Sequence, residues 1–544
     1  MRRRDIFSLP ALALGLNPIA AVAASSPLPR VFNILDYGAQ PGGKTRNTTQ
    51  IQRAIDAASQ NGGGIVYVPP GTFLTGGLVL RSRITLYLEA GSVLLGSTDV
   101  ADFTLQPGPP TEGDANGRHL LFARDAVDLT ITGLGTIDGQ GQAFWAKSNR
   151  KQPPSDELWG DVVAFDWKPN TQQRPSPLLE FAYCRNLHIE NITISNAPGW
   201  TLRPVACDSV FIHGLRIRNP LYGPNSDGID VTASKNVFIS NCDIDCGDDA
   251  ICLKSENPYG ELLPTKNITI TNCILTCCCN GFKMGTATHG VFENIVFSNS
   301  VIYNKDVPLN ERVISGIAVE MVDGGSVDGV LVSNIRMQNV RTPLFIRLGR
   351  RSGSSATSLR NIMVQGLDAT GSVLTSSITG VAGSRVQDVT LENIRIRTAE
   401  NGAPPWTDHN VPEQVNFYPE ARMFGRLPAF GLYVRHSDRI RLRNIELIHE
   451  KPDARPALLC DDVHDLNLTG LEATAPASGA PVVALRNTSH AFLHGSRAPV
   501  GAAAFLHVSG SSNDIALAAN DLKGATRSVV FADGAESTSV RGDP

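Results

Sequence analysis

The sequence predicts an all-β fold, a right-handed parallel β-helix in a single domain with a short cap helix near its N-terminus. Pairs of short alternating β runs recur with Asn, Asp or Gly between them, and these segments start at residues 186, 209, 236 and 267, 23, 27 and 31 residues apart. Long helical periodicity is scarce between them, and such a recurring unit without helices is typical of a solenoid. An antiparallel sandwich, the weaker alternative, would place hairpin turns at shorter spacing. The clearest segments are "NLHIENITISN" (186–196), "SVFIHGLRIRN" (209–219), "NVFISNCDIDC" (236–246), "NITITNCILTC" (267–277), "GVLVSNIRMQN" (329–339), "DVTLENIRIRT" (388–398) and "RIRLRNIELIH" (439–449).

The first element along the chain is an expected signal peptide over residues 1–24. Three arginines precede a short apolar run, and Ala21-Val22-Ala23 fits the small-x-small cleavage pattern. Arg3-Arg4 indicates the twin-arginine route. We therefore expect export to the periplasm or the extracellular space, and no later stretch is long and apolar enough to predict a membrane helix.

One helix is expected in "NTTQIQRAIDAASQNGG", with Thr48 or Thr49 as its cap and Gly62-Gly63 at its end. The division we expect places the N-terminal cap and first coils at 32–100 and the catalytic β-helix at 101–470. The Ala-, Ser- and Gly-rich residues 471–544 would then form the C-terminal coils and cap.

Composition limits the classes of partner. The formal net charge of −4 over 544 residues indicates no surface for nucleic acid, and we expect a monomer. Ten cysteines in an exported chain are compatible with disulfides. "TCCCN" at 276–280 lacks zinc-site spacing, so the order of expectation is buried thiols, then one or two disulfides, then a metal site.

Two acidic segments carry the chemistry. "PNSDGIDV" contains Asp227, and "CGDDAICL" contains Asp248 and Asp249, 21 and 22 residues further on. Because one coil of a β-helix takes about 20–30 residues and coils stack about 4.8 Å apart, Asp227 should lie beside Asp249 and Asp248 beside Ser226. Carboxylates at that range oppose joint ionisation, so at least one pKa should rise, which suits glycoside hydrolysis. Ordinary turn aspartates and a calcium site are the alternatives.

From about residue 32 to at least 465 the chain resembles the polygalacturonase family, glycoside hydrolase family 28, in its bacterial exported branch. "NSDGID" resembles the Asn-Thr-Asp motif of the family and "CGDDAICLKS" its Gly-Asp-Asp motif. Further resemblances are "VFNILDYGA", "GGGIVYVPPGTF", "GLGTIDGQG" and "NAPGWTLRPVACDSVFI". The resemblance implies an inverting hydrolase of pectic polysaccharide without metal or cofactor. It implies Asp248 as general acid, Asp227 with Asp249 as the groups that activate water, and Asn225 as a ligand for a substrate hydroxyl or carboxylate.

Two family motifs are missing. Cys279 or Asn280 takes the place of the His in Gly-His-Gly, and His289 lies further on, where it would reach the cleft only from a loop. Ala318 and Glu320 stand where the Arg and Lys of Arg-Ile-Lys are expected to bind a substrate carboxylate. This argues against plain homogalacturonan at that subsite.

Other cations could compensate for the missing pair. By the alternation of the strands, Lys283 should point to the same face of the sheet as Asp230 and Ala318, and it is the cation we expect in the cleft. Lys254 should point to the same face. Solvated surface positions are expected for Arg203, Arg341 and Arg347. Sugar stacking or plain loop packing is expected for Trp406, Phe417 and Tyr418.

The prediction is therefore an exported glycoside hydrolase that cleaves pectic polysaccharide. Three alternatives stay open: a rhamnogalacturonan-directed hydrolase on the same fold, a calcium-dependent pectate lyase, and a glycan-binding β-helix that has lost catalysis.

Overall fold

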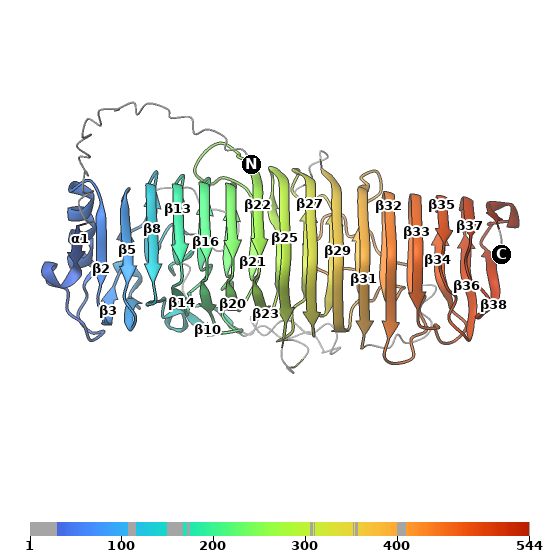
Figure 1. The fold of residues 1–544 in the computed structure, drawn as a ribbon, viewed down its shortest axis with the longest axis horizontal. Coiled ribbons are helices and arrows are strands. Elements are labelled where there is room, and N and C mark those ends of the chain that lie inside the picture. Colours follow the sequence, from blue (N-terminus) through green and yellow to red (C-terminus); the bar gives the residue numbers. More distant parts are fainter. Residues whose placement is uncertain are drawn as a thin grey trace, which may run out of the picture.

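The computed structural model describes residues 30–106, 116–148, 167–170, 174–304, 308, 311–351, 353, 357–399 and 410–542. The predicted signal peptide at 1–24 and Trp406 lie outside this part of the chain. The described residues form one long stack of strands, closed at one end by helix α1 (Thr48–Gln60), with the C-terminus at the other end (Figure 1). The strands pair in parallel from coil to coil, which confirms the predicted parallel β-helix and excludes the sandwich.

The strands fall into three parallel series, in which each strand pairs with the equivalent strand of the next coil. The first series contains β1 (Val31–Asn33), β2 (Gly64–Val68), β5 (Ile84–Leu88), β8 (Val127–Gly133), β13 (Arg185–Glu190), β16 (Asp208–His213), β19 (Lys235–Ser240), β22 (Thr265–Thr271), β25 (Val291–Tyr303), β27 (Ser326–Gln338), β29 (Ser358–Ser372), β31 (Val386–Thr398), β32 (Leu432–His449), β33 (Leu458–Ala473), β35 (Ser489–His494), β37 (Asn513–Ala518) and β39 (Val540–Gly542). The second contains β3 (Gly71–Thr75), β6 (Ser92–Gly96), β9 (Thr136–Asp138), β14 (Thr193–Ser195), β17 (Arg216–Arg218), β20 (Asp243–Cys246) and β23 (Ile274–Cys277), and joins the first at β25.

The third series carries the candidate site. It contains β4 (Leu78–Val79), β7 (Leu121–Arg124), β12 (Leu179–Ala182), β15 (Leu202–Val205), β18 (Ile229–Thr232), β21 (Ile251–Ser255), β24 (Asn280–Thr288), β26 (Ser315–Met321), β28 (Thr342–Leu348), β30 (Ser376–Thr379), β34 (Pro481–Arg486), β36 (Ala502–Ser509) and β38 (Ala525–Ala532), and it passes through β32 and β33. A separate antiparallel pair is formed by β10 (Trp145–Lys147) and β11 (Trp167–Pro169). Short 3-10 helices lie at Ile34–Tyr37, Val100–Asp102, Gly141–Phe144 and Ser537–Ser539.

Asparagines explain why the β runs bend where they do. Asn236, Asn267 and Asn294 all have positive φ, which asparagine tolerates better than most residues. Their side chains also stack: Asn267 donates to Asn236 at 3.0 Å, and Asn294 donates to Asn267 at 3.1 Å. The recurrent Asn of the sequence is therefore a turn residue that hydrogen-bonds to its equivalent in the neighbouring coil.

Helix α1 covers the open end of the stack, as predicted, but its cap differs. Thr48 is its first helical residue, and the N-cap is Asn47, which makes no side-chain capping bond to the helix. The Thr48 hydroxyl instead accepts a hydrogen bond from the backbone of Gly76 at 2.7 Å. The expected helix is correct and the expected capping role of Thr48 or Thr49 is wrong.

The interior of the stack is apolar. Val210, Val237, Ile268 and Ile295 hold equivalent positions on successive coils and are buried, so each coil packs its side chains on those of the next. All ten cysteines are buried and free, which confirms the first of the three expectations for them. Among the described residues there is no helix long and apolar enough to cross a membrane.

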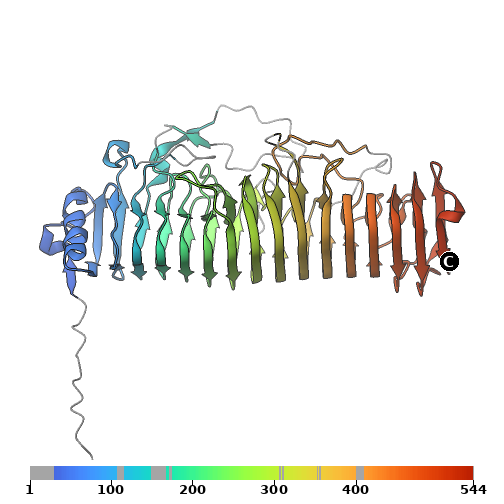
Figure 2. The same cartoon turned by 90° about the horizontal axis from the view of Figure 1, so that it is seen from above.

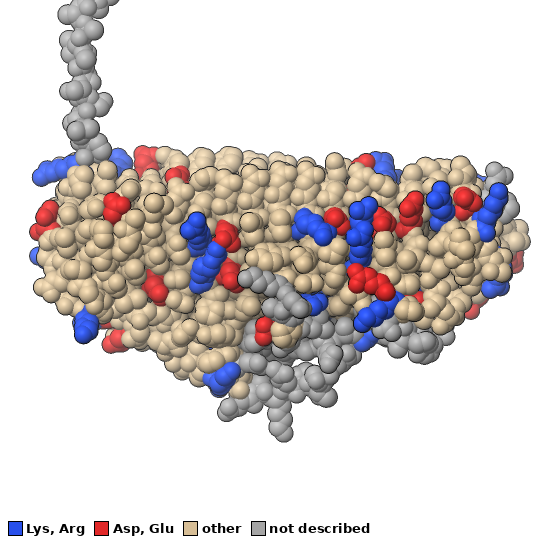
Figure 3. All heavy atoms as spheres, turned by 60° about the horizontal axis from the view of Figure 1, so that its bottom comes forward, with Lys and Arg blue, Asp and Glu red and all other residues tan. Residues whose placement is uncertain are grey.

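Irregular segments gather along one side of the stack (Figure 2). On the face that Figure 3 shows, Lys and Arg side chains lie beside Asp and Glu side chains, and the coloured residues of this face form no extended patch of one charge. This distribution fits the near-neutral net charge of the chain.

Candidate active site

The two acidic turns lie directly above one another in neighbouring coils. The backbone of Gly228 donates to Asp249 O at 2.9 Å, and that of Ile229 donates to Ala250 O at 3.1 Å. In β18 and β21, Ile229 pairs with Ile251 and Asp230 with Cys252, an offset of 22 residues. The predicted alignment of Asp227 with Asp249 is therefore the alignment in the structure.

Small residues allow this close approach. The Ser226 hydroxyl, fully buried, donates to Gly223 O at 2.8 Å and accepts from the backbone of Gly247 at 3.1 Å. A Cβ on Gly247 would lie 2.6 Å from that hydroxyl oxygen, and a Cβ on Gly228 would lie 2.4 Å from Ala250 O. The glycines beside the aspartates are thus required by contact between the coils.

The acidic side chains line a cavity of about 220 Å³ on the outer side of the third series. Three aspartates, two lysines and two aromatic rings contribute to it. The lining residues are Trp200, Asn225, Asp227, Asp248, Asp249, Lys254, Lys283, Thr286, Ala287 and Tyr418. Its volume and its mixture of charged and aromatic groups suit part of a carbohydrate chain.

Both carboxyl oxygens of Asp249 have buried partners. Its Oδ1 accepts from the backbone nitrogen of Asn280 at 3.1 Å and from the Asn280 side chain at 2.6 Å. Its Oδ2 lies 3.0 Å from the Nζ of Lys283, and both side chains are buried. These contacts fix the position of the Asp249 side chain in the cavity, so Asp249 is placed to accept a proton from a water molecule.

The surroundings of the other two aspartates, Asp248 and Asp227, favour their protonated forms. Burial, and then the charge of Asp249, raises the pKa of Asp248 to about 6. Burial, and then the charges of Asp248, Asp230 and Asp249, raises the pKa of Asp227 well above its usual range. The rise in pKa expected from crowded carboxyl groups is therefore found for Asp248 and Asp227, with burial as its larger cause.

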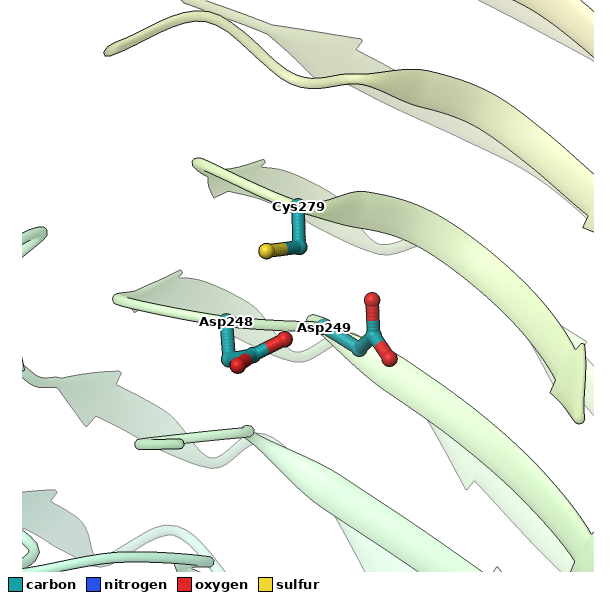
Figure 4. A group of neighbouring side chains, drawn as sticks. All are labelled: Asp248, Asp249 and Cys279. Carbon is teal, nitrogen blue, oxygen red and sulfur yellow. The ribbon is translucent and has the colours of Figure 1, made fainter. Parts of the chain in front are cut away.

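Cys279 stands beside this cluster, on the next coil. Figure 4 shows the Cys279 side chain on the coil next to the one that carries Asp248 and Asp249, and one ligand atom from each of the three lies within 4.8 Å of the others. A hydrogen bond from this thiol to Asp248 partly offsets the burial and charge that raise the pKa of that carboxyl. Cys279 thus contacts the aspartates from the coil where the missing family His was expected.

These three residues suit a metal ion poorly. Calcium binds oxygen rather than sulfur ligands, and a thiol is a weak partner for it. The Lys283 ammonium already lies against Oδ2 of Asp249, and the Asn280 side chain donates a hydrogen bond to Oδ1. A cation bound between Asp248 and Asp249 would lie close to this ammonium group and would be repelled by it.

Both lysines that were expected in the cleft line the cavity, in different settings. Lys283 lies 3.0 Å from Asp249 and donates to the Tyr418 hydroxyl at 3.4 Å. The Nζ of Lys254 lies 4.8 Å from the centre of the Trp200 ring and 3.8 Å from Oδ1 of Asp230. Tyr418 therefore does reach the cavity, as the stacking hypothesis requires.

Other predicted site residues lie elsewhere. Glu320 is 1% exposed, is not among the residues that line the cavity, and lies behind Lys283 at 3.9 Å. Burial raises its pKa to about 8, against the opposing effect of Lys283. His289 is exposed and does not line the cavity, and neither does Phe417, which is also exposed.

The expectation of solvated arginines is wrong. Arg203, Arg341 and Arg347 are each no more than 1% exposed. Arg203 lies 2.6 Å from Glu180, its register partner on the preceding coil. Arg347 donates to the backbone oxygens of Gly380, Glu413 and Gln414, and so holds the loop that carries Tyr418.

Sequence reasoning gave no role to two residues of the site. Asp230 is fully buried, neither of its oxygens has a hydrogen-bond partner among the described residues, and burial raises its pKa to about 7, against the opposing charge of Lys254. Trp200 fixes Lys254 by a ring contact. The alternation of the strand places Asp230 and Lys254 on the same face of the sheet. They are not register partners, however, because Asp230 lies opposite Cys252 and Lys254 lies opposite Thr232.

The fold, a parallel β-helix with a cavity lined by carboxyl groups, is that of a glycoside hydrolase. Residues 103–416 match the family model "Glycosyl hydrolases family 28", and the chain belongs to that family of glycoside hydrolases. Residues 31–152 match the model "Rhamnogalacturonase A/epimerase, pectate lyase-like".

Individual relatives agree with this assignment. A probable polygalacturonase of Vitis vinifera is 28% identical over 403 residues, which cover 70% of this chain and 77% of that protein. An exo-poly-alpha-D-galacturonosidase of Dickeya chrysanthemi is 27% identical, over 65% of each chain. In the solved exopolygalacturonase from Thermotoga maritima the fold is similar, with a TM-score of 0.57 and 24% identity, over 76% of this chain and 92% of that one.

Proposed function

We propose that this chain hydrolyses α-glycosidic bonds of galacturonate-containing pectic polysaccharide, with inversion at the anomeric carbon. The relatives named above as polygalacturonases support the substrate class. The observation that carries the mechanism is the asymmetry within the acidic cluster. Asp249 accepts from Asn280 and lies against Lys283, whereas crowding and burial favour a proton on Asp248.

In this mechanism Asp248 donates its proton to the glycosidic oxygen as the bond from that oxygen to the anomeric carbon breaks. A water molecule attacks the anomeric carbon from the opposite face and gives its proton to Asp249. Asp227, with a strongly raised pKa, is protonated in the free enzyme and orients the water by hydrogen bonding rather than accepting the first proton. Asn225, at the edge of the cavity, is placed to hold a substrate hydroxyl or carboxylate.

The reaction type is tested by product analysis with polygalacturonan in the presence of a chelator. We expect saturated oligogalacturonates or galacturonate, with a rate unchanged by the chelator. An unsaturated product whose formation stops in chelator and resumes with calcium would identify a lyase and overturn the proposal. Binding of oligogalacturonates without turnover would identify a non-catalytic glycan-binding module.

A second candidate is a hydrolase directed at rhamnogalacturonan or another pectic chain with a neutral sugar at the cut. Buried Ala318 in place of a cation favours it, because nothing positive stands at that position. Release of reducing ends from homogalacturonan and from rhamnogalacturonan, measured side by side, separates the two candidates. A rate on rhamnogalacturonan at least tenfold higher would favour the second.

Export belongs to the same proposal. The arginines and the apolar run within residues 1–24 support a cleaved signal peptide and secretion by a bacterial cell, by the twin-arginine route. The test is the N-terminal sequence of the protein recovered from outside the cytoplasm, expected to begin shortly after Ala23. An intact N-terminus on protein confined to the cytoplasm would contradict it.

A further inference from the structure

The cavity contains two lysines, and only one of them has a charge available for a ligand. Lys283 and Lys254 are the cations among its lining residues in the described part of the chain. Lys283 already has partners, because its Nζ lies 3.0 Å from Asp249 and donates to the Tyr418 hydroxyl at 3.4 Å. A substrate carboxylate that bound Lys283 would have to compete with Asp249.

Two neighbouring arginines also form ion pairs with buried carboxyl groups. Arg203, which also contacts the Trp200 ring, lies 2.6 Å from the buried carboxylate of Glu180. Arg351, near the ring of Tyr418, lies 2.8 Å from Asp323. Each of these guanidinium groups already balances a buried carboxylate, so neither offers a net charge to the cavity.

Lys254 differs from all of these. Its Nζ is 3.8 Å from Asp230, beyond hydrogen-bond range, and no hydrogen bond to it is seen among the described residues. Lys254 is 6% exposed and lines the cavity, and the Trp200 ring holds its ammonium group at 4.8 Å. This leaves donor positions on Lys254 that a ligand in the cavity can fill.

We propose that Lys254 binds the carboxylate of a uronic acid unit of the substrate, and that Lys283 is a positioning residue for Asp249 and not a substrate ligand. The inference rests on the proposed function and adds the residue that selects a charged sugar. Trp200 orients Lys254, and protonation of Asp230 below neutral pH leaves the Lys254 charge free for the substrate.

The test compares kcat/KM on oligogalacturonate with kcat/KM on the same oligomer after reduction of its carboxyl groups to alcohols. The ratio of the two values measures preference for the charged sugar and cancels general damage to catalysis. In Lys254→Met this ratio should fall about tenfold to a hundredfold, the worth of one charge-assisted hydrogen bond. In the matched control Lys283→Met both values should fall together, so the ratio should stay within about threefold of wild type.

Lys254→Arg, which keeps the charge, should retain most of the preference, and Lys254→Gln replaces the Met variant if that variant does not fold. The inference is overturned if Lys254→Met and Lys254→Gln leave the ratio unchanged, or if Lys283→Met lowers it as far as they do. If the wild-type protein cleaves neither oligomer, the proposed function itself fails. These outcomes are distinct, because the first two require an active wild-type enzyme.

Discussion

The Nζ of Lys283 lies 3.0 Å from Oδ2 of Asp249, although the two residues come from different coils and are separated by 34 positions in the chain. This contact gives Asp249 a buried cationic partner beside two other aspartates. It also removes the charge of Lys283 from use by a ligand. Both consequences lead to measurable predictions.

Replacement of Lys283 by Met should impair Asp249, the proposed general base. Without the ammonium group, Oδ2 of Asp249 loses its buried partner, and the side chain is no longer held in place. We expect kcat to fall by about 10²-fold, in line with the usual worth of general acid–base catalysis, with little change in KM. The measurement is kcat and KM for each variant; Lys283→Arg should restore most of kcat. A rise in KM with an unchanged kcat in Lys283→Met would contradict the positioning role.

Replacement of Asp248 by Asn keeps the shape of the side chain and removes its proton. Activity should fall about 10²–10⁴-fold, and the descending limb of the pH–rate profile, which the pKa of about 6 places near neutral pH, should disappear. Circular dichroism serves as the folding control. A folded variant with near wild-type turnover would remove Asp248 from the role of acid.

The affinity for an anionic substrate should depend on Asp230. This carboxyl, with a pKa of about 7, faces Lys254, Arg203, Asp248 and Asp249. As pH rises through about 7, Asp230 ionises, pairs with Lys254 and competes with the substrate carboxylate, so KM should rise. In Asp230→Asn this rise should be lost. KM measured from pH 5.5 to 8.5 checks it, and equal pH dependence in both proteins would argue against the pairing.

Stability should fall as pH rises, because the native state holds protons that the unfolded state releases. Glu320 has a native pKa of about 8 against an ordinary value near 4.5, so its contribution is most favourable below about pH 4.5 and is lost progressively up to about pH 8. The loss is on the order of a few kcal/mol. Glu320→Gln, neutral at every pH, should reduce the difference in Tm between pH 5 and pH 8 by a few degrees. The partly exposed Glu293 of β25 is the matched control, and Glu293→Gln should leave that difference unchanged; an equal effect in both variants would count against the raised pKa.

The repeats allowed much of this architecture to be predicted from the sequence. Period and alternation were enough to align Asp227 with Asp249 and to place Lys283 on the outer side of the strand, since parallel register preserves parity from coil to coil. The ion pair of Arg203 with Glu180 follows from the same register, because Glu180 is the partner of Arg203 one coil earlier.

Contacts made by loops and turns could not be predicted. Tyr418 is 135 positions from Lys283, and its approach depends on a loop whose path no period determines. The hydrogen bonds to Oδ1 of Asp249 come from the backbone and the side chain of Asn280, on the following coil. The position of Asn280 in the sequence carries no signal that its backbone and side chain both donate to Asp249.

The most direct test of the account is the anomeric configuration of the first product. In an inverting reaction one carboxyl group accepts a proton from the attacking water and a separate one protonates the leaving oxygen, the roles proposed for Asp249 and Asp248. Proton NMR of oligogalacturonate hydrolysis, recorded in the first minutes before mutarotation, should show the β-anomer appearing first from the α-linked substrate. Initial appearance of the α-anomer would mean retention through a covalent intermediate, and would contradict the roles given to Asp248 and Asp249.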